Sequence, residues 1–267
     1  MNEETRDRWP RPRFVFVAGL HRTGTSLIAR SLGAHPRISA IAGSGAPEDE
    51  GCYLQGAIPH TALDGIPGHY ATDERQHLVE GCTFDRLETR DRMLSDWTPW
   101  FDRQADWWLE KSPVNLTRMR LYQQLFPMSH FVVVLRHPAI MAEALQKWSH
   151  RSVGELTKYG LDAYDRMQTD LDYLHCATVI RYEDLVARPE TIRQALFAFL
   201  ELPDHVSSIA IRNGNADYEA ATPIDRQTEA RLARLGYGAG GEVHEIAPVV
   251  RHPLRNIKER TERLLIS

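Results

Sequence analysis

Residues 14–33, FVFVAGLHRTGTSLIARSLG, decide how this chain folds. An apolar run with strand character ends at Gly19, a short polar turn follows, and an apolar pattern with helical spacing begins after Gly24. A glycine-containing turn between a strand and a helix exposes backbone N–H groups at the positive end of the helix dipole, and together these bind an anion. The segment therefore predicts an α/β protein with a phosphate-binding loop after its first strand.

The rest of the chain repeats this alternation of strands and helices. Further strands are predicted at residues 38–41, 107–109, 131–135 and 178–180, and one-sided apolar faces predict helices at 140–148 and 156–174. Pro138 and Pro189 stand where prolines begin helices, each directly after a strand. The pattern predicts a three-layer α/β fold, P-loop-like, in which helices flank a central parallel sheet.

No linker divides the chain, so residues 14–267 are expected to form a single domain after a flexible N-terminal segment, residues 1–13. Two stretches rich in glycine and proline, residues 42–70 and 236–248, predict long loops. Long loops in a compact domain are often functional.

The composition is that of an ordinary globular protein. The 267 residues are 42% hydrophobic and 25% charged, with a formal net charge of −4. Such a balance does not attract nucleic acid or anionic lipid, so neither is an expected partner. Cys52, Cys82 and Cys176 form no CxxC pair, and no histidine stands at zinc-finger spacing, which argues against a disulfide framework and a structural zinc site. The sequence has no signal peptide and no apolar run long enough to cross a bilayer, so a cytoplasmic protein is expected.

The residues of the first loop distinguish two kinds of phosphate site. Gly19 and Gly24 have the spacing of the loop that binds magnesium nucleoside triphosphates, but Thr25 stands where that loop has a lysine. The cation is instead Arg22, inside the loop, whose forked guanidinium suits a phosphate or a bridging oxygen. The pattern favours a site for a 5′-phosphate over a magnesium-triphosphate site.

Residues 21–26, HRTGTS, resemble the 5′-phosphate loop of the sulfotransferases that use 3′-phosphoadenosine-5′-phosphosulfate (PAPS), in the arginine form of the branch that includes tyrosylprotein and many bacterial enzymes. Further segments follow in the family's order: EKSP at residues 110–113, FP at 126–127 with FVVVLRHP at 131–138, and RYEDL at 181–185. The resemblance implies a sulfuryl transfer from PAPS to an acceptor, with 3′-phosphoadenosine 5′-phosphate (PAP) as product and without a metal.

The resemblance also implies roles for individual residues. Arg136 closes an apolar strand before Pro138, which places it at the carboxyl edge of the sheet, and by resemblance it binds the 3′-phosphate. Lys111, at the end of another strand, contacts the phosphosulfate group in the family, where a cation stabilises charge developing on the leaving phosphate oxygen, a role that Arg22 can share. The other cofactor-binding residues that the loop implies are Thr23, Gly24, Thr25 and Ser26.

One position departs from the family. Ala144 stands eight residues after Arg136, where the family has a serine that contacts the 3′-phosphate. Lys147 shares a predicted helical face with Ala144 and is the expected replacement for that contact. Late basic residues are further candidates for reaching the same phosphate: Arg251, Arg255 and Lys258.

The acceptor hydroxyl must lose a proton as it attacks, so a general base is expected near the nucleophile. Glu50 is the predicted base, because it follows the second strand and holds the acidic position before Gly51 that related bacterial sequences share. The alternatives left open are Glu48, Asp49, His60 and His69.

Two groups of residues are interpreted as structural. Tyr182 is expected to pack beneath the phosphate loop, and Asp184 to orient the turn that follows its strand. Large aromatics belong to a core or its rim more often than to a ligand pocket, and this interpretation covers Trp97, Trp100, Trp107 and Trp108.

Two other functions remain open on the sequence alone. A P-loop kinase of a small hydroxylated substrate would share the sheet and the loop, although Thr25 replaces its lysine. A noncatalytic nucleotide-binding protein would retain the loop and explain Ala144. The acceptor is expected to be the hydroxyl of a small molecule; its identity and the oligomeric state of the chain are not predicted.

Overall fold

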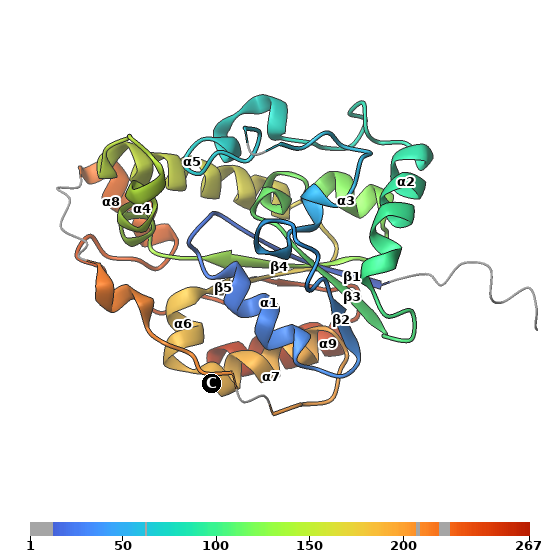
Figure 1. The fold of residues 1–267 in the computed structure, drawn as a ribbon. Helices are drawn as coiled ribbons and strands as arrows, with labels where there is room; N and C mark the ends of the chain where they lie inside the picture. The colour runs from blue at the N-terminus through green and yellow to red at the C-terminus, as the bar shows by residue number, and fades with distance from the viewer. Residues whose placement is uncertain (1–12, 62, 207–208, 219–224) are drawn as a thin grey trace, which may run out of the picture.

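The computed structural model describes residues 13–61, 63–206, 209–218 and 225–267. Within them, six strands form one sheet in the order β2-β3-β1-β4-β5-β6 (Figure 1). The first five strands are parallel, and β6 runs antiparallel to β5. The strand bounds are β1 (Arg13–Gly19), β2 (Ile38–Ala40), β3 (Trp107–Lys111), β4 (His130–Leu135), β5 (Ala177–Arg181) and β6 (Val250–Arg251).

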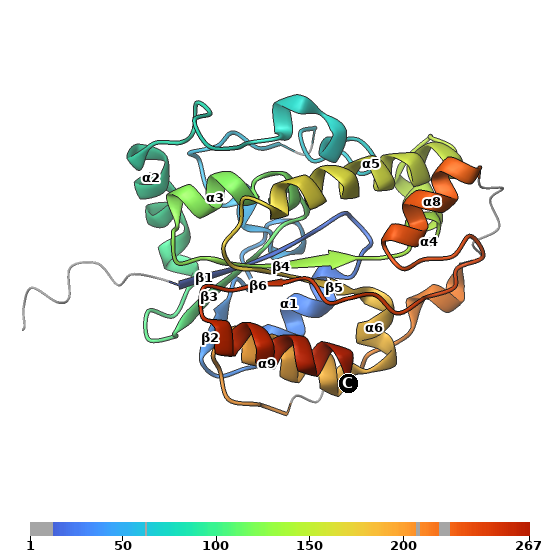
Figure 2. The same ribbon diagram turned by 180° about the vertical axis from the view of Figure 1, so that it is seen from behind.

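Helices cover both faces of this sheet. In Figure 1 one layer holds α1 (Thr25–Gly33), α6 (Tyr182–Ala187), α7 (Pro189–Phe199) and α9 (Arg255–Ile266). The opposite layer holds α2 (Leu87–Trp97), α3 (Met119–Leu125), α4 (Pro138–Leu145), α5 (Val153–Leu171) and α8 (Arg226–Arg234). β6 and α9 are the last elements of the described chain. Figure 2, seen from behind, shows that α9 packs beside α7. The predicted three-layer α/β fold is confirmed.

The alternation along β1 explains why the sheet is buried on both sides. Phe14 and Phe16 point into the core beneath α2, α3 and α5, whereas Val15 and Val17 point into the core beneath α1 and α7. All four side chains are fully buried. Each contributes about 1.5–3 kcal/mol of transfer free energy. A strand buried on both faces reads as a continuous apolar run, which is the pattern of residues 14–18.

The structure corrects several details of the prediction. Pro189 begins a helix as expected, but it follows α6 and not a strand. The helix that Pro138 begins ends at Leu145, and a 3₁₀ turn, Gln146–Trp148, continues it. Arg13 belongs to β1, and the rest of the predicted flexible segment, residues 1–12, lies outside the described residues.

The two predicted loops contain only short irregular elements. In residues 42–61 and 63–70 the elements are 3₁₀ turns such as Pro47–Asp49 and Gly51–Tyr53, and residues 236–248 carry one isolated bridge between Tyr237 and Val243. None of the helices in the described part of the chain is long and apolar enough to span a bilayer.

The order of the strands determines where a ligand fits. From β1 the chain crosses through α1 to β2 on one side of the sheet, and from β3 it crosses through α3 to β4 on the other side of β1. Such a reversal leaves a crevice outside the carboxyl ends of the two neighbouring strands, here β1 and β4. Gly19 ends β1 and Arg136 follows β4, so both candidate phosphate-binding segments meet at this crevice.

Candidate active site

The predicted phosphate loop connects β1 to α1 through two left-handed residues, Arg22 at φ 69° and Gly24 at φ 98°. Thr23 is fully buried, and its hydroxyl donates to the carbonyl oxygen of Leu20 at 2.8 Å. The hydroxyl of Thr23 is thus used inside the loop. The N–H groups of Thr25 and Ser26, in the first turn of α1, have no acceptor within the helix. They form the positive end of the helix dipole.

Tyr182 packs against this loop, as expected. A Cβ atom placed on Gly24 would lie 2.6 Å from Cδ2 of the Tyr182 ring, closer than real Cβ atoms approach other atoms. Asp184 orients the next turn as expected: its carboxylate accepts from Arg181 Nε at 2.7 Å and lies 3.7 Å from Arg188. In the RYEDL segment, Tyr182 therefore packs against the phosphate loop, and Asp184 fixes the turn that follows β5.

Arg136 lies beside the loop and is held by three hydrogen bonds. Its guanidinium donates to the carbonyl oxygens of Arg22 at 2.8 Å and Gly214 at 3.0 Å, and to Asn215 Oδ1 at 2.8 Å. A guanidinium has five N–H donors, so two remain for a ligand. Burial lowers the pKa of Arg136, although the group stays a cation at neutral pH. Neither Gly214 nor Asn215 could be predicted from the sequence, because one contributes a backbone carbonyl and the other a single amide in a short turn.

A second cation, Lys147, lies near the loop because it and Arg22 contact the same ring, that of Trp148. The Arg22 guanidinium lies 5.2 Å from the centre of the Trp148 ring, and Lys147 Nζ lies 4.6 Å from the same ring centre. Arg22 Nε is buried without a hydrogen-bond partner. Lys147 is exposed and Ala144 is buried, and the 3₁₀ turn means that they do not share an α-helical face as predicted. Trp148 nevertheless brings Lys147 to the edge of the loop.

By the resemblance to the PAPS-dependent family, the substitution Lys147→Ala is expected to weaken PAP binding by about 3- to 5-fold, because an exposed ion pair contributes at most about 1 kcal/mol. Titration calorimetry on both proteins measures it. Lys158→Ala removes a lysine that pairs with Asp162 on the surface of α5 and is the matched control. Unchanged affinity of the Lys147 variant would contradict the role assigned to this lysine.

The predicted base and the predicted transfer-site cation are in contact. Lys111 ends β3 with its side chain buried, and its Nζ donates to Glu50 Oε1 at 3.2 Å and to the carbonyl oxygen of Glu48 at 3.1 Å. Burial raises the pKa of Glu50 to about 7, and the charge of Lys111 acts in the opposite direction. A carboxylate with such a pKa can accept a proton and release it near neutral pH.

Buried side chains clamp the residue after Glu50. Gly51 donates its N–H to Glu110 Oε1 at 2.9 Å, and its carbonyl oxygen accepts from Trp97 Nε1 at 2.8 Å. A Cβ atom on Gly51 would lie 2.6 Å from Glu110 Cγ, so only glycine fits here. Glu110 is fully buried, burial raises its pKa, and Asn115 also donates to it. Glu110 is therefore a positioning residue for Glu50, a role that the sequence analysis missed.

The other four candidate bases have different surroundings. Asp49 accepts hydrogen bonds from Ser44, which lower its pKa and fix the loop. Glu48 and His69 are exposed, and His60 Nδ1 lies 3.3 Å from Arg118 Nη2. Among the described residues, none of these four side chains forms a hydrogen bond or ion pair with Lys111.

His21 is a further proton acceptor that the sequence analysis did not consider. Burial first, and the nearby charge of Lys111 second, lower the pKa of His21 to about 4. Its imidazole is neutral at pH 7, and Nδ1 is buried without a hydrogen-bond partner. The only sequence signal was its place inside the phosphate loop.

The prediction that late basic residues reach the phosphate site is wrong. Arg251 pairs in register with Ala177, at the start of β5, and so lies at the amino edge of the sheet, where it binds Asp172. The other two lie on α9, where Arg255 binds Glu259 and Lys258 lies near Glu262. An antiparallel last strand reverses the chain away from the crevice. The tryptophans mostly belong to the core, as interpreted: Trp97, Trp107 and Trp108 are buried and Trp100 is partly exposed.

A cavity of about 680 Å³ opens beside Lys111. It lies between α1 and the loop before Glu50, and its lining includes Ser26 and Arg30 of α1 and the loop residues Glu48 and Asp49. The first turn of α1 and the end of β3 thus share one concave space. A molecule in this space would contact Lys111 and the first turn of α1, whereas Glu50 does not line the cavity and borders it only through its contact with Lys111.

Comparison with known proteins identifies the family and similar folds. The model of the sulfotransferase family matches residues 12–206. The sulfotransferase domain from the curacin biosynthetic pathway is similar in structure, with a TM-score of 0.53 at 15% identity over 85% of this chain and 98% of that domain. A sulfotransferase from Alicyclobacillus acidocaldarius gives a TM-score of 0.47 at 20% identity over 84% of this chain and 95% of that one. No curated protein matches the sequence. Because the family model covers most of the chain, including the phosphate loop, Lys111 and Arg136, the chain belongs to the sulfotransferase family.

Proposed function

We propose that this protein transfers the sulfuryl group of PAPS to the hydroxyl of a small molecule. The observation that carries the proposal is the buried contact between Lys111 and Glu50 beside the phosphate loop. A cation and a proton acceptor are the two groups that sulfuryl transfer to a hydroxyl requires. Family membership supports the reaction class, and the donor and the acceptor class are our inference.

The residues around the loop fit the donor. Its 5′-phosphosulfate is an anion, and the free N–H groups of the first turn of α1 together with the partly unpartnered Arg22 suit an anion. The two N–H donors that Arg136 retains are assigned to the 3′-phosphate, with Lys147 at the rim. This local positive charge offsets the net charge of −4 of the whole chain.

Lys111 and Glu50 have different tasks in the proposed reaction. The hydroxyl oxygen of the acceptor attacks sulfur in line, the bond from sulfur to the bridging oxygen breaks, and the bridging oxygen leaves on the 5′-phosphate of PAP. Glu50 takes the hydroxyl proton as the new O–S bond forms. Lys111 and Arg22 stabilise the charge that develops on the bridging oxygen.

The substitution Glu50→Gln is expected to lower kcat by about 100-fold and to change its pH dependence. In the wild type the carboxylate must be ionised to accept a proton, so kcat should fall as the pH drops through about 7, the raised pKa of Glu50. This acidic limb should vanish in the variant. Steady-state rates between pH 5.5 and 9 measure both effects, and Glu74→Gln, which changes an exposed glutamate that pairs with Arg166, is the control. An acidic limb that persists in Glu50→Gln would transfer the role of base to another group, with His21 as the first to test.

The donor is tested by calorimetric titration with PAP and with ADP, each with and without Mg²⁺, on the wild type and Arg136→Ala. We expect tight PAP binding without Mg²⁺, weaker ADP binding, and loss of the preference for PAP in the variant. Arg136→Lys and thermal unfolding of both variants separate loss of the contact from loss of the loop structure, since Arg136 also holds Arg22.

Two other results would replace the proposal. Binding of ADP or ATP that requires Mg²⁺ would indicate the P-loop kinase. Binding of no nucleotide would indicate a site that has lost its function, with Ala144 as the first position to restore to serine. If instead PAP binds as expected, the acceptor is sought by screening hydroxyl compounds against the cavity beside Lys111.

A further inference from the structure

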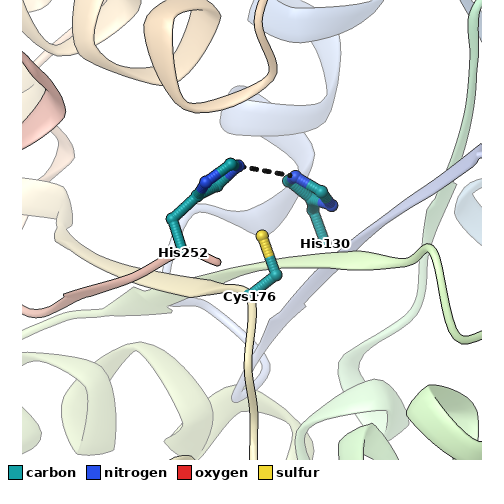
Figure 3. A group of neighbouring side chains, drawn as sticks. All are labelled: His130, Cys176 and His252. Carbon is teal, nitrogen blue, oxygen red and sulfur yellow. Dashed lines mark hydrogen bonds between the residues drawn. The ribbon is translucent and has the colours of Figure 1, made fainter. Parts of the chain in front are cut away.

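Two histidines and a cysteine meet at the amino edge of the sheet, at the opposite ends of the strands from the phosphate loop (Figure 3). His130 is the first residue of β4, Cys176 directly precedes β5, and His252 directly follows β6. The Nε2 atoms of the two histidines lie 3.2 Å apart. These two atoms and the Cys176 sulfur all lie within 4.8 Å of one another.

The separation of the two nitrogens suits a shared metal ion. Two imidazole nitrogens that each bind Zn²⁺ at about 2.0–2.1 Å in a tetrahedral site lie about 3.3 Å apart. Figure 3 shows the sulfur of Cys176 directed toward the two rings. Tetrahedral Zn²⁺ with a Zn–S bond of about 2.3 Å places sulfur and nitrogen about 3.6 Å apart, so each sulfur-to-nitrogen distance, now within 4.8 Å, has to shorten by no more than about 1.2 Å.

The surroundings support the two rings in this orientation. The His130 ring packs edge-on against Trp107 with centroids 4.7 Å apart, and Phe199 contacts both histidines. His252 Nδ1 accepts a hydrogen bond from the backbone N–H of Leu254 at 3.0 Å and lies 3.3 Å from the carbonyl oxygen of Leu254. When Nε2 binds a metal, Nδ1 carries the proton, so the hydrogen bond from the N–H is replaced by one that Nδ1 donates to this carbonyl oxygen. Arg13, a cation at the same edge, is paired with Glu201 at 2.6 Å.

We propose that His130, Cys176 and His252 bind a zinc ion. Nitrogen and sulfur ligands select Zn²⁺ over Mg²⁺ or Ca²⁺, which prefer oxygen. His130 and Cys176 are buried, whereas His252 is partly exposed and gives the ion a route from solvent. Three protein ligands leave the fourth tetrahedral position to water. This proposal revises the prediction that the chain has no structural zinc site. That prediction was argued from spacing along the sequence, whereas these three ligands lie far apart in sequence and the sheet brings them together.

The zinc ion would join parts of the chain that are far apart in sequence. His130 and Cys176 lie within residues 12–206, which match the family model, whereas His252 lies in the segment after them. The ion would therefore link the segment that holds β6 and α9 to β4 and β5. No step of the proposed reaction passes through the ion.

Metal content and spectroscopy test the proposal on the full chain. After removal of metals with a chelator, titration with Zn²⁺ should give one equivalent bound and a higher unfolding temperature, and Mg²⁺ should give neither. Substitution with Co²⁺ should produce a thiolate-to-cobalt charge-transfer absorption and the intense visible bands of a tetrahedral site. Cys176→Ser should abolish the charge-transfer absorption, and His252→Gln should weaken Zn²⁺ binding by at least about 100-fold, since loss of an outer contact alone costs 10–100-fold.

Two matched controls accompany these variants. Cys82→Ser changes a cysteine outside the cluster, and His175→Gln changes the exposed histidine beside Cys176. Both should retain one equivalent of Zn²⁺ and the cobalt spectrum. Less than about a tenth of an equivalent bound by the wild type, or an unchanged cobalt spectrum in Cys176→Ser, would overturn the proposal. Because His252→Gln alters a partly exposed side chain, its circular dichroism spectrum without metal should match that of the wild type and shows whether it folds.

Discussion

Replacing Lys111 by alanine is expected to lower kcat by about 1000-fold, the upper end of the effect of removing one preorganised charge-stabilising donor. The Nζ group is buried at the end of β3, where its attraction for developing negative charge is poorly screened by water. The same substitution leaves Glu50 buried without its partner and raises the pKa of the carboxyl further. The acidic limb of the pH–rate profile should therefore move to higher pH in the variant.

The measurement compares kcat, the KM for PAPS and PAP affinity in the variant and the wild type. PAP affinity should fall by no more than about 10-fold, since Lys111 is assigned mainly to the transition state. Lys258→Ala, on α9 at the far side of the molecule, is the control for loss of a lysine. A fall in PAP affinity as large as the fall in kcat would show that Lys111 serves binding and not the transfer step.

The substitution Gly24→Ala is expected to weaken PAP binding by about 1000-fold, because a shifted loop misplaces several donors and each hydrogen bond to a charged group contributes about 1.5–3 kcal/mol. Two physical effects act together. A side chain at φ 98° strains the backbone, and the new Cβ atom would lie 2.6 Å from the Tyr182 ring. Either the ring or the loop must move, and both support the phosphate site.

The control for this variant isolates the clash from the strain. Gly81 also has a left-handed backbone, at φ 73°, but a Cβ atom there meets nothing within 4 Å. Gly81→Ala should lower the free energy of unfolding by about 1 kcal/mol and leave PAP affinity unchanged. Tyr182→Ala alone should also lower affinity, but adding Gly24→Ala to it should cost less affinity than Gly24→Ala costs in the wild type if the clash is the cause. Equal losses of affinity in the Gly24 and Gly81 variants would refute this explanation.

Much of the fold was predictable because its signals are local. Five parallel strands read as short apolar runs, and each predicted strand lies within two residues of the observed bounds. Arg136 and Lys111 were placed correctly because each directly follows or ends such a run, and the carboxyl ends of parallel strands share one edge. Lys111 and Glu50 were selected from the sequence on separate grounds, but their contact was not predicted and required the structure.

The remaining features depend on contacts that leave no pattern in the sequence. The partners of Arg136 at residues 214 and 215 are a backbone carbonyl and an amide in a short turn. The positions of Arg251, Arg255 and Lys258 depend on the direction of β6, a strand of only two residues. Lys147 was expected on an α-helical face, but the helix ends at Leu145, so its place beside Trp148 required the structure.

The three hydrogen bonds of Arg136 have a thermodynamic consequence. A single buried guanidinium joins the carbonyl of Arg22 to the turn at Gly214, although almost two hundred residues separate these two segments in sequence. A ligand that binds the loop at Arg22 therefore changes the free energy of local unfolding of the turn at Gly214. Because this coupling is reciprocal, the turn contributes to the affinity for the ligand without touching it. Amide hydrogen exchange in residues 209–218 thus reports on occupancy of a loop near the start of the chain.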